Sequence, residues 1–201
     1  MPRASIATAL VALLGASVIV GAGAQQSAFN PLGGMQEVTA SKGLPVPTAG
    51  ADDTLAQRGE YLVGLLGCAS CHTDGALIGQ PDPGRALAGS NIGIAYTNPM
   101  GGRHPGVVYP ANLTPDPDTG LGGWSEEEIV TLLRSGKGRH GRQTRPIMPW
   151  ISYARLSDED AQAIARYLMT IPPVRHRVPP AVAPGTPART PLVHVGLYRS
   201  R

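Results

Sequence analysis

Both cysteines of this chain lie in one five-residue segment, Cys68-Ala69-Ser70-Cys71-His72. Residues three apart on a helical turn lie on the same face, so the two thiols point to the same side of the backbone. A histidine follows the second thiol directly, and imidazole nitrogen is a common metal ligand. The segment therefore predicts a site of covalent or metal chemistry, and the rest of the chain decides which kind.

The pattern favours covalent attachment of one haem c. The thiols of Cys68 and Cys71 can form thioethers with two vinyl groups on one edge of a haem, which holds His72 beneath the iron as proximal ligand. A redox-active disulfide would need the alternating strand–helix pattern of a thioredoxin-like fold, which this sequence lacks. A zinc site would need a fourth ligand, and there is no second cysteine pair.

The N-terminus has the composition of an export signal. Arg3 precedes an apolar run over residues 4–20, and Ala22-Gly23-Ala24 matches the small-residue cleavage pattern. We expect cleavage after residue 24; the alternative is an uncleaved membrane anchor, because the run nearly reaches spanning length. Either outcome places the remainder of the chain outside the cytoplasm, and the predicted location is the periplasm.

Composition divides the chain into four parts: a signal peptide or anchor (1–24), a flexible linker (25–51), a folded domain (52–173) and a Pro/Arg-rich tail (174–201). The tail has no acidic residue, and we expect it to be solvated and disordered rather than a docking arm. A net charge of only +3 does not suggest nucleic-acid binding. One Phe and two Trp leave the core short of aromatic side chains, which a large flat apolar cofactor would supply.

Apolar periodicity predicts three helices, at about residues 53–66, at 125–135 and from 157 to just before Pro172. Ser125 and Glu128 form a capping box, and Gly136 ends that helix. Acidic residues 158–160 lie in the first turn of the last helix, where the helix dipole favours them. No strand pattern is evident, so the predicted class is all-α, with long Gly/Pro-rich loops wrapped around the haem.

The second axial ligand is expected in the segment Arg145-Pro146-Ile147-Met148-Pro149-Trp150. A thioether suits low-spin haem iron, and the flanking prolines restrict the backbone around Met148. The alternative role of Met148 is to fill space in the core, a common role of methionine. The competing ligands are Met100, His104 and His140, whereas Met35 lies in the linker and Met169 ends a packed helix.

With these features the sequence resembles a class I c-type cytochrome. More narrowly, it resembles the haem modules of cytochrome subunits that serve periplasmic or membrane-associated alcohol, aldehyde and sugar-acid dehydrogenases. The resemblance covers most of residues 53–173 and rests on stretches in the expected order: Arg58–Leu62, Cys68–His72, Leu87–Gly89, Asn112–Asp116, Thr119–Trp124, Ile147–Trp150, Leu156–Asp160 and Tyr167-Leu168.

The resemblance implies a cytochrome c-like fold in which the first and last helices cross. Gly59 would permit their close approach, Tyr61 would face the region of Tyr167, and Met148 would be the distal ligand. Two departures are visible in the sequence: this chain has one module where such subunits often have several, and residues 98–110 look inserted.

The resemblance also implies further residues of the haem pocket. Asn112 and Thr114 would belong to the loop around the haem, and Trp124 and Trp150 would form part of its wall. Arg142 or Arg145 would pair with a haem propionate or remain solvated on the surface.

Histidine and methionine ligation would leave no open position on the iron, which favours electron transfer over catalysis. We therefore expect an electron carrier rather than an enzyme, acting as subunit or acceptor of a periplasmic or membrane-associated dehydrogenase and passing electrons to a respiratory acceptor. An open-site haem enzyme or gas sensor is the alternative if Met148 is not the axial ligand. A third hypothesis is a docking module that anchors a larger enzyme through its tail or its N-terminal segment. A retained N-terminal segment would also associate the protein with the membrane.

Overall fold

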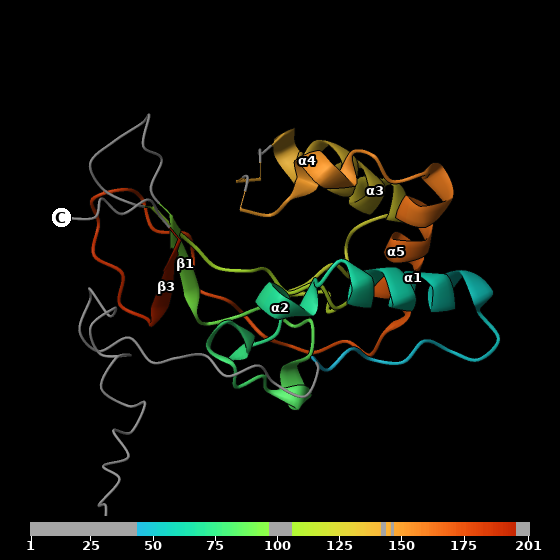
Figure 1. Cartoon of the computed structure of the whole chain (residues 1–201), viewed down its shortest axis with the longest axis horizontal. Coiled ribbons are helices and arrows are strands. Elements are labelled where there is room, and N and C mark those ends of the chain that lie inside the picture. The colour runs from blue at the N-terminus through green and yellow to red at the C-terminus, as the bar shows by residue number, and fades with distance from the viewer. Residues whose placement is uncertain (1–43, 97–105, 142–143, 146, 196–201) are drawn as a thin grey trace, which may run out of the picture. The chain divides into compact units, whose positions relative to one another are not determined.

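The computed structural model describes residues 44–96, 106–141, 144–145 and 147–195 (Figure 1). Its α-helices are α1 (Thr54–Leu65), α2 (Ala69–His72), α3 (Glu126–Ser135), α4 (Trp150–Tyr153) and α5 (Asp158–Thr170). Short 3₁₀ turns lie at η3 (Ala76–Ile78), η4 (Pro83–Arg85) and η5 (Arg139–Gly141). The strands are β1 (Gly93–Tyr96), β2 (Gly106–Val108) and β3 (Leu192–Val195).

The three helices predicted from the sequence are confirmed, together with the residues that begin and end them. The Ser125 hydroxyl accepts from the Glu128 backbone while the Glu128 carboxylate accepts from the Ser125 backbone, which completes the capping box of α3. Gly136 ends this helix with a φ of 67°. Ser157 caps α5 by accepting from the backbone N–H of Asp160.

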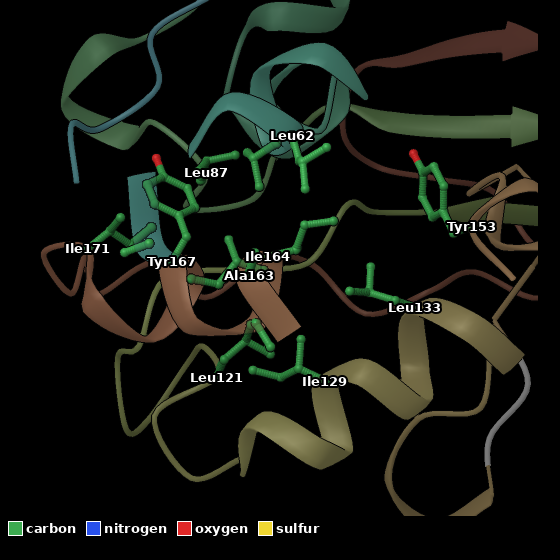
Figure 2. Packing of buried hydrophobic residues seen from close by; sticks show 14 of the residues in the cluster. Leu62, Leu87, Leu121, Ile129, Leu133, Tyr153, Ala163, Ile164, Tyr167 and Ile171 are labelled. Carbon is green, nitrogen blue, oxygen red and sulfur yellow. The ribbon is translucent and has the colours of Figure 1, made fainter. Parts of the chain in front are cut away.

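Helices α1 and α5 cross at Gly59, as the resemblance implied. A β-carbon on Gly59 would lie 2.0 Å from the carbonyl oxygen of Ala163 and 2.5 Å from Cβ of Tyr167. The side chain of Tyr167 is fully buried in the core beside this contact, and its hydroxyl donates to the carbonyl of Pro47 at 2.5 Å (Figure 2). The missing side chain at Gly59 therefore sets how closely the two helices pack.

The expectation that Tyr61 faces the Tyr167 region is wrong. Tyr61 and Leu65 are 66% and 65% exposed. At 3.6 residues per turn these two residues lie on the face of α1 opposite to Gly59 and Val63, which pack against the core.

A small sheet corrects the all-α prediction. Its strand order is β2-β1-β3, with β1 antiparallel to β2 and parallel to β3. β1 and β3 lie side by side although about 100 residues separate them in the chain (Figure 1). Strands of three or four residues are too short to show an alternating pattern in the sequence.

The segments expected to be linker and tail also pack on the domain. The backbone N–H of Ala49 donates to the Glu60 carboxylate at 2.7 Å, so the end of the predicted linker lies against α1. Beyond Pro173, Val182 exchanges backbone hydrogen bonds with Val107, and β3 follows. The described part of the tail is therefore held by partners more than 50 residues earlier in the chain.

No helix among the described residues is long and apolar enough to cross a membrane. The predicted signal peptide or anchor lies outside the described residues, as do Met35, Met100 and His104.

We expect Gly59→Ala to lower the free energy of unfolding by about 3 kcal/mol or more, because the added methyl group overlaps the backbone of α5. Gly64→Ala is the matched control on the same helix, since a β-carbon there meets no atom within 4 Å. This control should be stabilising by roughly 0.5–1 kcal/mol through helix propensity. Urea unfolding followed by circular dichroism measures both; equal effects at the two positions would contradict the tight crossing.

Candidate functional site

A cavity of about 500 Å³ lies beside the α1–α5 crossing. It is lined by residues from α2, the sheet, α3, the segment before α4, and α5. Most of the lining is aliphatic, from Leu66, Ile94, Val108, Leu113, Leu121, Ile129, Leu132, Leu133, Ile164 and Leu168. The size and the apolar wall suit a large apolar ligand held by a few polar groups.

The cysteine segment forms one edge of this cavity. Gly67, with a φ of 69°, turns the chain from α1 into α2, and His72 N donates to the Cys68 carbonyl at 3.0 Å. Cys68, Cys71 and His72 all line the cavity. Burial raises the pKa of the Cys68 thiol to about 11 and raises that of Cys71, so both thiols are protonated at neutral pH. Redox-active cysteines have lowered pKa values instead.

The ring of His72 is fixed by one hydrogen bond. Nδ1 lies 2.7 Å from the carbonyl oxygen of Ala111, and because a carbonyl can only accept, Nδ1 carries the proton. Burial also lowers the pKa of His72, which favours the neutral ring. A neutral imidazole protonated at Nδ1 has Nε2 available as a ligand, and such a second partner is the usual way to orient a metal-binding histidine.

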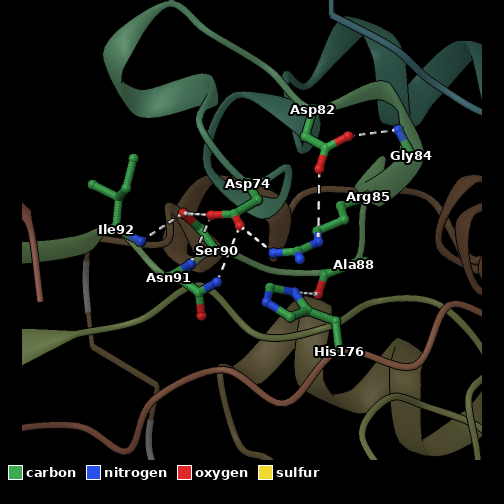
Figure 3. Close-up of polar contacts among 9 residues, drawn as sticks. All are labelled: Asp74, Asp82, Gly84, Arg85, Ala88, Ser90, Asn91, Ile92 and His176. Atoms are coloured by element: carbon green, nitrogen blue, oxygen red, sulfur yellow. Dashed lines mark hydrogen bonds and ion pairs between the residues drawn. The ribbon is translucent and has the colours of Figure 1, made fainter.

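The loop that follows His72 is fixed by the carboxylate of Asp74. This carboxylate accepts from the Asn91 backbone at 2.9 Å, from the Asn91 side chain at 3.1 Å and from Arg85 at 2.8 Å (Figure 3). Partial burial acts to raise the pKa of Asp74, but these hydrogen bonds outweigh it and the pKa is lowered. The charged carboxylate therefore holds the ends of the loop over residues 74–91 together.

Met148 lines the same cavity as the cysteines and His72. Its backbone N–H donates to the Arg145 carbonyl at 3.2 Å, and its carbonyl accepts from Trp150 N at 2.8 Å, in a turn that leads into α4. Met169 is half-buried on α5 and does not line the cavity. Of the competing ligands, Met100 and His104 lie outside the described residues, as does the side chain of His140.

Asn112 and Thr114 are not among the residues that line the cavity, and their contact with a haem stays a prediction. Both are buried one layer behind the wall, and Leu113 between them faces the cavity. The Asn112 side chain accepts from the Thr114 backbone at 2.9 Å and donates to the Val174 carbonyl at 2.7 Å. These two side chains support the wall rather than form it.

The two tryptophans are also not among the lining residues, and their place in the wall around a haem stays a prediction. Trp150 is half-buried, and its Nε1 is buried without a hydrogen-bond partner among the described residues. The Arg139 guanidinium lies 5.2 Å from the centre of the Trp124 ring. Arg145 lines the cavity as an exposed residue, whereas Arg142 lies outside the described residues.

Two tyrosines of the cavity were missed at the level of sequence. Tyr153 is 8% exposed and lines the cavity. Burial raises the pKa of Tyr153 to about 12, so the hydroxyl keeps its proton. Tyr109 lines the cavity and its hydroxyl lies 2.7 Å from Oγ1 of Thr190. The sequence offered one indication of this role: Tyr153 follows Met148 by five residues, on the same short turn and helix.

The residues present fit a covalently held haem. Two thiols, a neutral imidazole and a thioether line one apolar cavity, and these are the groups that attach and ligate a haem c. Residues 56–172 match the family described as Cytochrome c.

The chain belongs to the cytochrome c family. It is 38% identical over 119 residues to the cytochrome c subunit of the quinone alcohol dehydrogenase from Gluconobacter oxydans, covering 59% of this chain and 22% of that protein. It is 35% identical over 148 residues to the cytochrome subunit of fructose dehydrogenase from Gluconobacter japonicus, covering 74% and 26%. A diheme c-type cytochrome from Cereibacter sphaeroides is 34% identical over 119 residues, covering 59% and 36%.

The chain thus spans about a quarter of the length of the two dehydrogenase subunits, and 36% of the diheme protein. A cytochrome c domain implies covalent haem c, which agrees with the placement of Cys68, Cys71 and His72 at the cavity.

Arg145 provides a test of the electrostatics of this cytochrome. A cation at the rim of the cavity disfavours the additional positive charge of ferric haem, so Arg145→Gln should lower the midpoint potential by on the order of tens of millivolts. Arg145→Lys keeps the charge and should retain most of the potential. Spectroelectrochemical titration measures both variants, and an equal drop in the two would show that packing rather than charge is responsible.

Proposed function

We propose that this chain is a monohaem c-type cytochrome that passes single electrons in the periplasm, as subunit or acceptor of a dehydrogenase. The observation that carries the proposal is the presence of His72 and Met148 on one apolar cavity together with both cysteine thiols. When bound, the haem supplies one-electron redox chemistry, and the protein supplies its attachment, ligation and burial.

Ligation from both sides favours electron transfer over catalysis. If His72 and Met148 both ligate the iron, no position would remain for a substrate, and methionine–histidine ligation would raise the reduction potential. The hydrogen bond from His72 to Ala111 holds the ring in place, and the turn before α4 restrains Met148. Both ligands therefore keep their positions when the iron changes its charge.

A single haem is proposed because the chain has two cysteines, and both belong to one attachment segment. Each attachment of this kind uses two cysteines and a following histidine. The diheme relative is longer, and this chain covers 36% of it.

A dehydrogenase is the proposed electron donor. Relatives of this chain are named as cytochrome subunits of alcohol, fructose and gluconate dehydrogenases. By similarity, we expect this chain to accept electrons from an enzyme of that kind and to deliver them to a respiratory acceptor. The apolar N-terminal run with its small-residue cleavage pattern supports export to the periplasm, and it would anchor the protein to the membrane if retained.

The proposal is tested by Met148→Ala in the exported holoprotein. We expect the oxidised wild-type protein to show a far-red sulfur-to-iron band that this variant lacks. The variant should also have a lower midpoint potential and bind carbon monoxide when reduced, because its sixth coordination position is open. Visible spectra of both oxidation states measure each effect.

Met169→Ala is the matched control. Met169 packs on the core outside the cavity, so this variant should keep the far-red band and lose only stability, by about 2 kcal/mol. A far-red band that survives Met148→Ala would move the ligand to another methionine, such as Met100. A wild-type covalent haem without this band would favour a histidine ligand, an open-site enzyme or a sensor. A wild-type protein without covalent haem would refute the proposal altogether.

A further inference from the structure

Residues 174–195, here called the C-terminal strap, run along the segment that forms one wall of the cavity. The first contact is Val174 N, which donates to Oγ1 of Thr114 at 3.0 Å. Further along, Val182 and Val107 exchange two backbone hydrogen bonds of 3.0 and 2.9 Å. The strap then ends as β3, paired with β1. These contacts are distributed over the length of the strap.

The strap fits into a space that the domain leaves for it. Gly89 has a φ of 85°, and a β-carbon there would lie 2.5 Å from Cγ1 of Val178. Next to this glycine, the carbonyl of Ala88 accepts from Nδ1 of His176 at 2.8 Å (Figure 3). A side chain at position 89 would push the strap away, so the strap is packed into the domain rather than laid on it.

The wall beneath the strap is the one that orients His72. Tyr109, Pro110, Ala111 and Leu113 line the cavity, and the Ala111 carbonyl is the partner of His72 Nδ1. The strap is bonded to this wall directly, because the hydroxyls of Thr190 and Tyr109 lie 2.7 Å apart. A second connection passes through residues 88 and 89, since Gly89 N donates to the backbone carbonyl of His72 at 2.8 Å.

From this arrangement we infer that the C-terminal strap is part of the haem pocket and contributes to its reduction potential. It holds the wall of residues 109–113 against the haem and keeps water from that side. Thr190 and His176 are positioning residues, since they act through Tyr109 and Ala88. The inference rests on the proposed function, because it concerns the haem that His72 would ligate.

The direction of the effect follows from charge. Ferric haem carries one more positive charge than ferrous haem, and water stabilises that charge better than an apolar wall does. Loosening the strap should therefore lower the midpoint potential. A weaker hydrogen bond from His72 to Ala111 would make the imidazole less electron-rich and would raise the midpoint potential. The sign of the change in potential therefore distinguishes entry of water from a change in the histidine ligand.

The test uses point variants of the full-length holoprotein. Thr190→Val and Tyr109→Phe each remove the bond between strap and wall at nearly constant volume. Each should lower the midpoint potential and speed oxidation of the reduced protein by dissolved oxygen several-fold. Because both remove the same bond, the double variant should shift the potential no further than either single one. Val178→Asp places a charge against Gly89 and should give a larger shift of the same sign.

Arg175→Ala is the control within the strap. Its ion pair with Asp118, at 3.2 Å, is exposed and lies away from the cavity lining, so potential and oxidation rate should not change. Urea unfolding of each variant separates stability from potential. If the strap variants lose stability but keep the wild-type potential, or if the potential rises, the inference is overturned. Absence of covalent haem from the wild-type protein would instead refute the proposed function.

Discussion

An apolar cavity at the centre of the domain is the constraint on which the other features depend. Its lining is mostly aliphatic, and a large apolar ligand would cover those side chains. With an aromatic content of 4%, the chain has few large side chains to fill such a space itself. A haem held there would therefore contribute apolar contacts that the chain's own side chains do not provide.

Each group that would hold the haem is restrained by a different local feature of the structure. The cysteines are presented by a single turn of helix, His72 by one carbonyl 39 residues later, and Met148 by a turn that leads into α4. The α1–α5 crossing at Gly59 in turn positions α1, the helix that precedes the cysteines. Separate restraints on each ligand suit an electron carrier, because a site held in position needs little rearrangement when its charge changes.

The sequence predicted the features that depend on neighbouring residues, and it missed those that depend on contacts between distant parts of the chain. The capping box of Ser125 and Glu128 involves neighbours, so its pattern was readable, and the cysteine segment carries its chemistry within five residues. The pairing of β1 with β3 joins residues about 100 apart, and neither strand is long enough to alternate. The tail was expected to be solvated because prolines and arginines usually indicate disorder, yet its order comes from partners that lie far away in the chain.

The buried polar residues behind the wall follow from the same long-range contact. The start of the strap is neither helix nor strand, so its buried N–H and C=O groups cannot bond to a regular neighbour and need side-chain partners. Thr114 accepts from Val174 N, Thr119 accepts from His176 N, and Asn112 donates to the Val174 carbonyl. The sequence alone could not distinguish hydrogen bonding to the strap from contact with the haem. The same polar residue types occur beside a ligand pocket and beside an irregular backbone. The polar loop over residues 112–119 thus serves the strap first, and the haem only through the wall that both support.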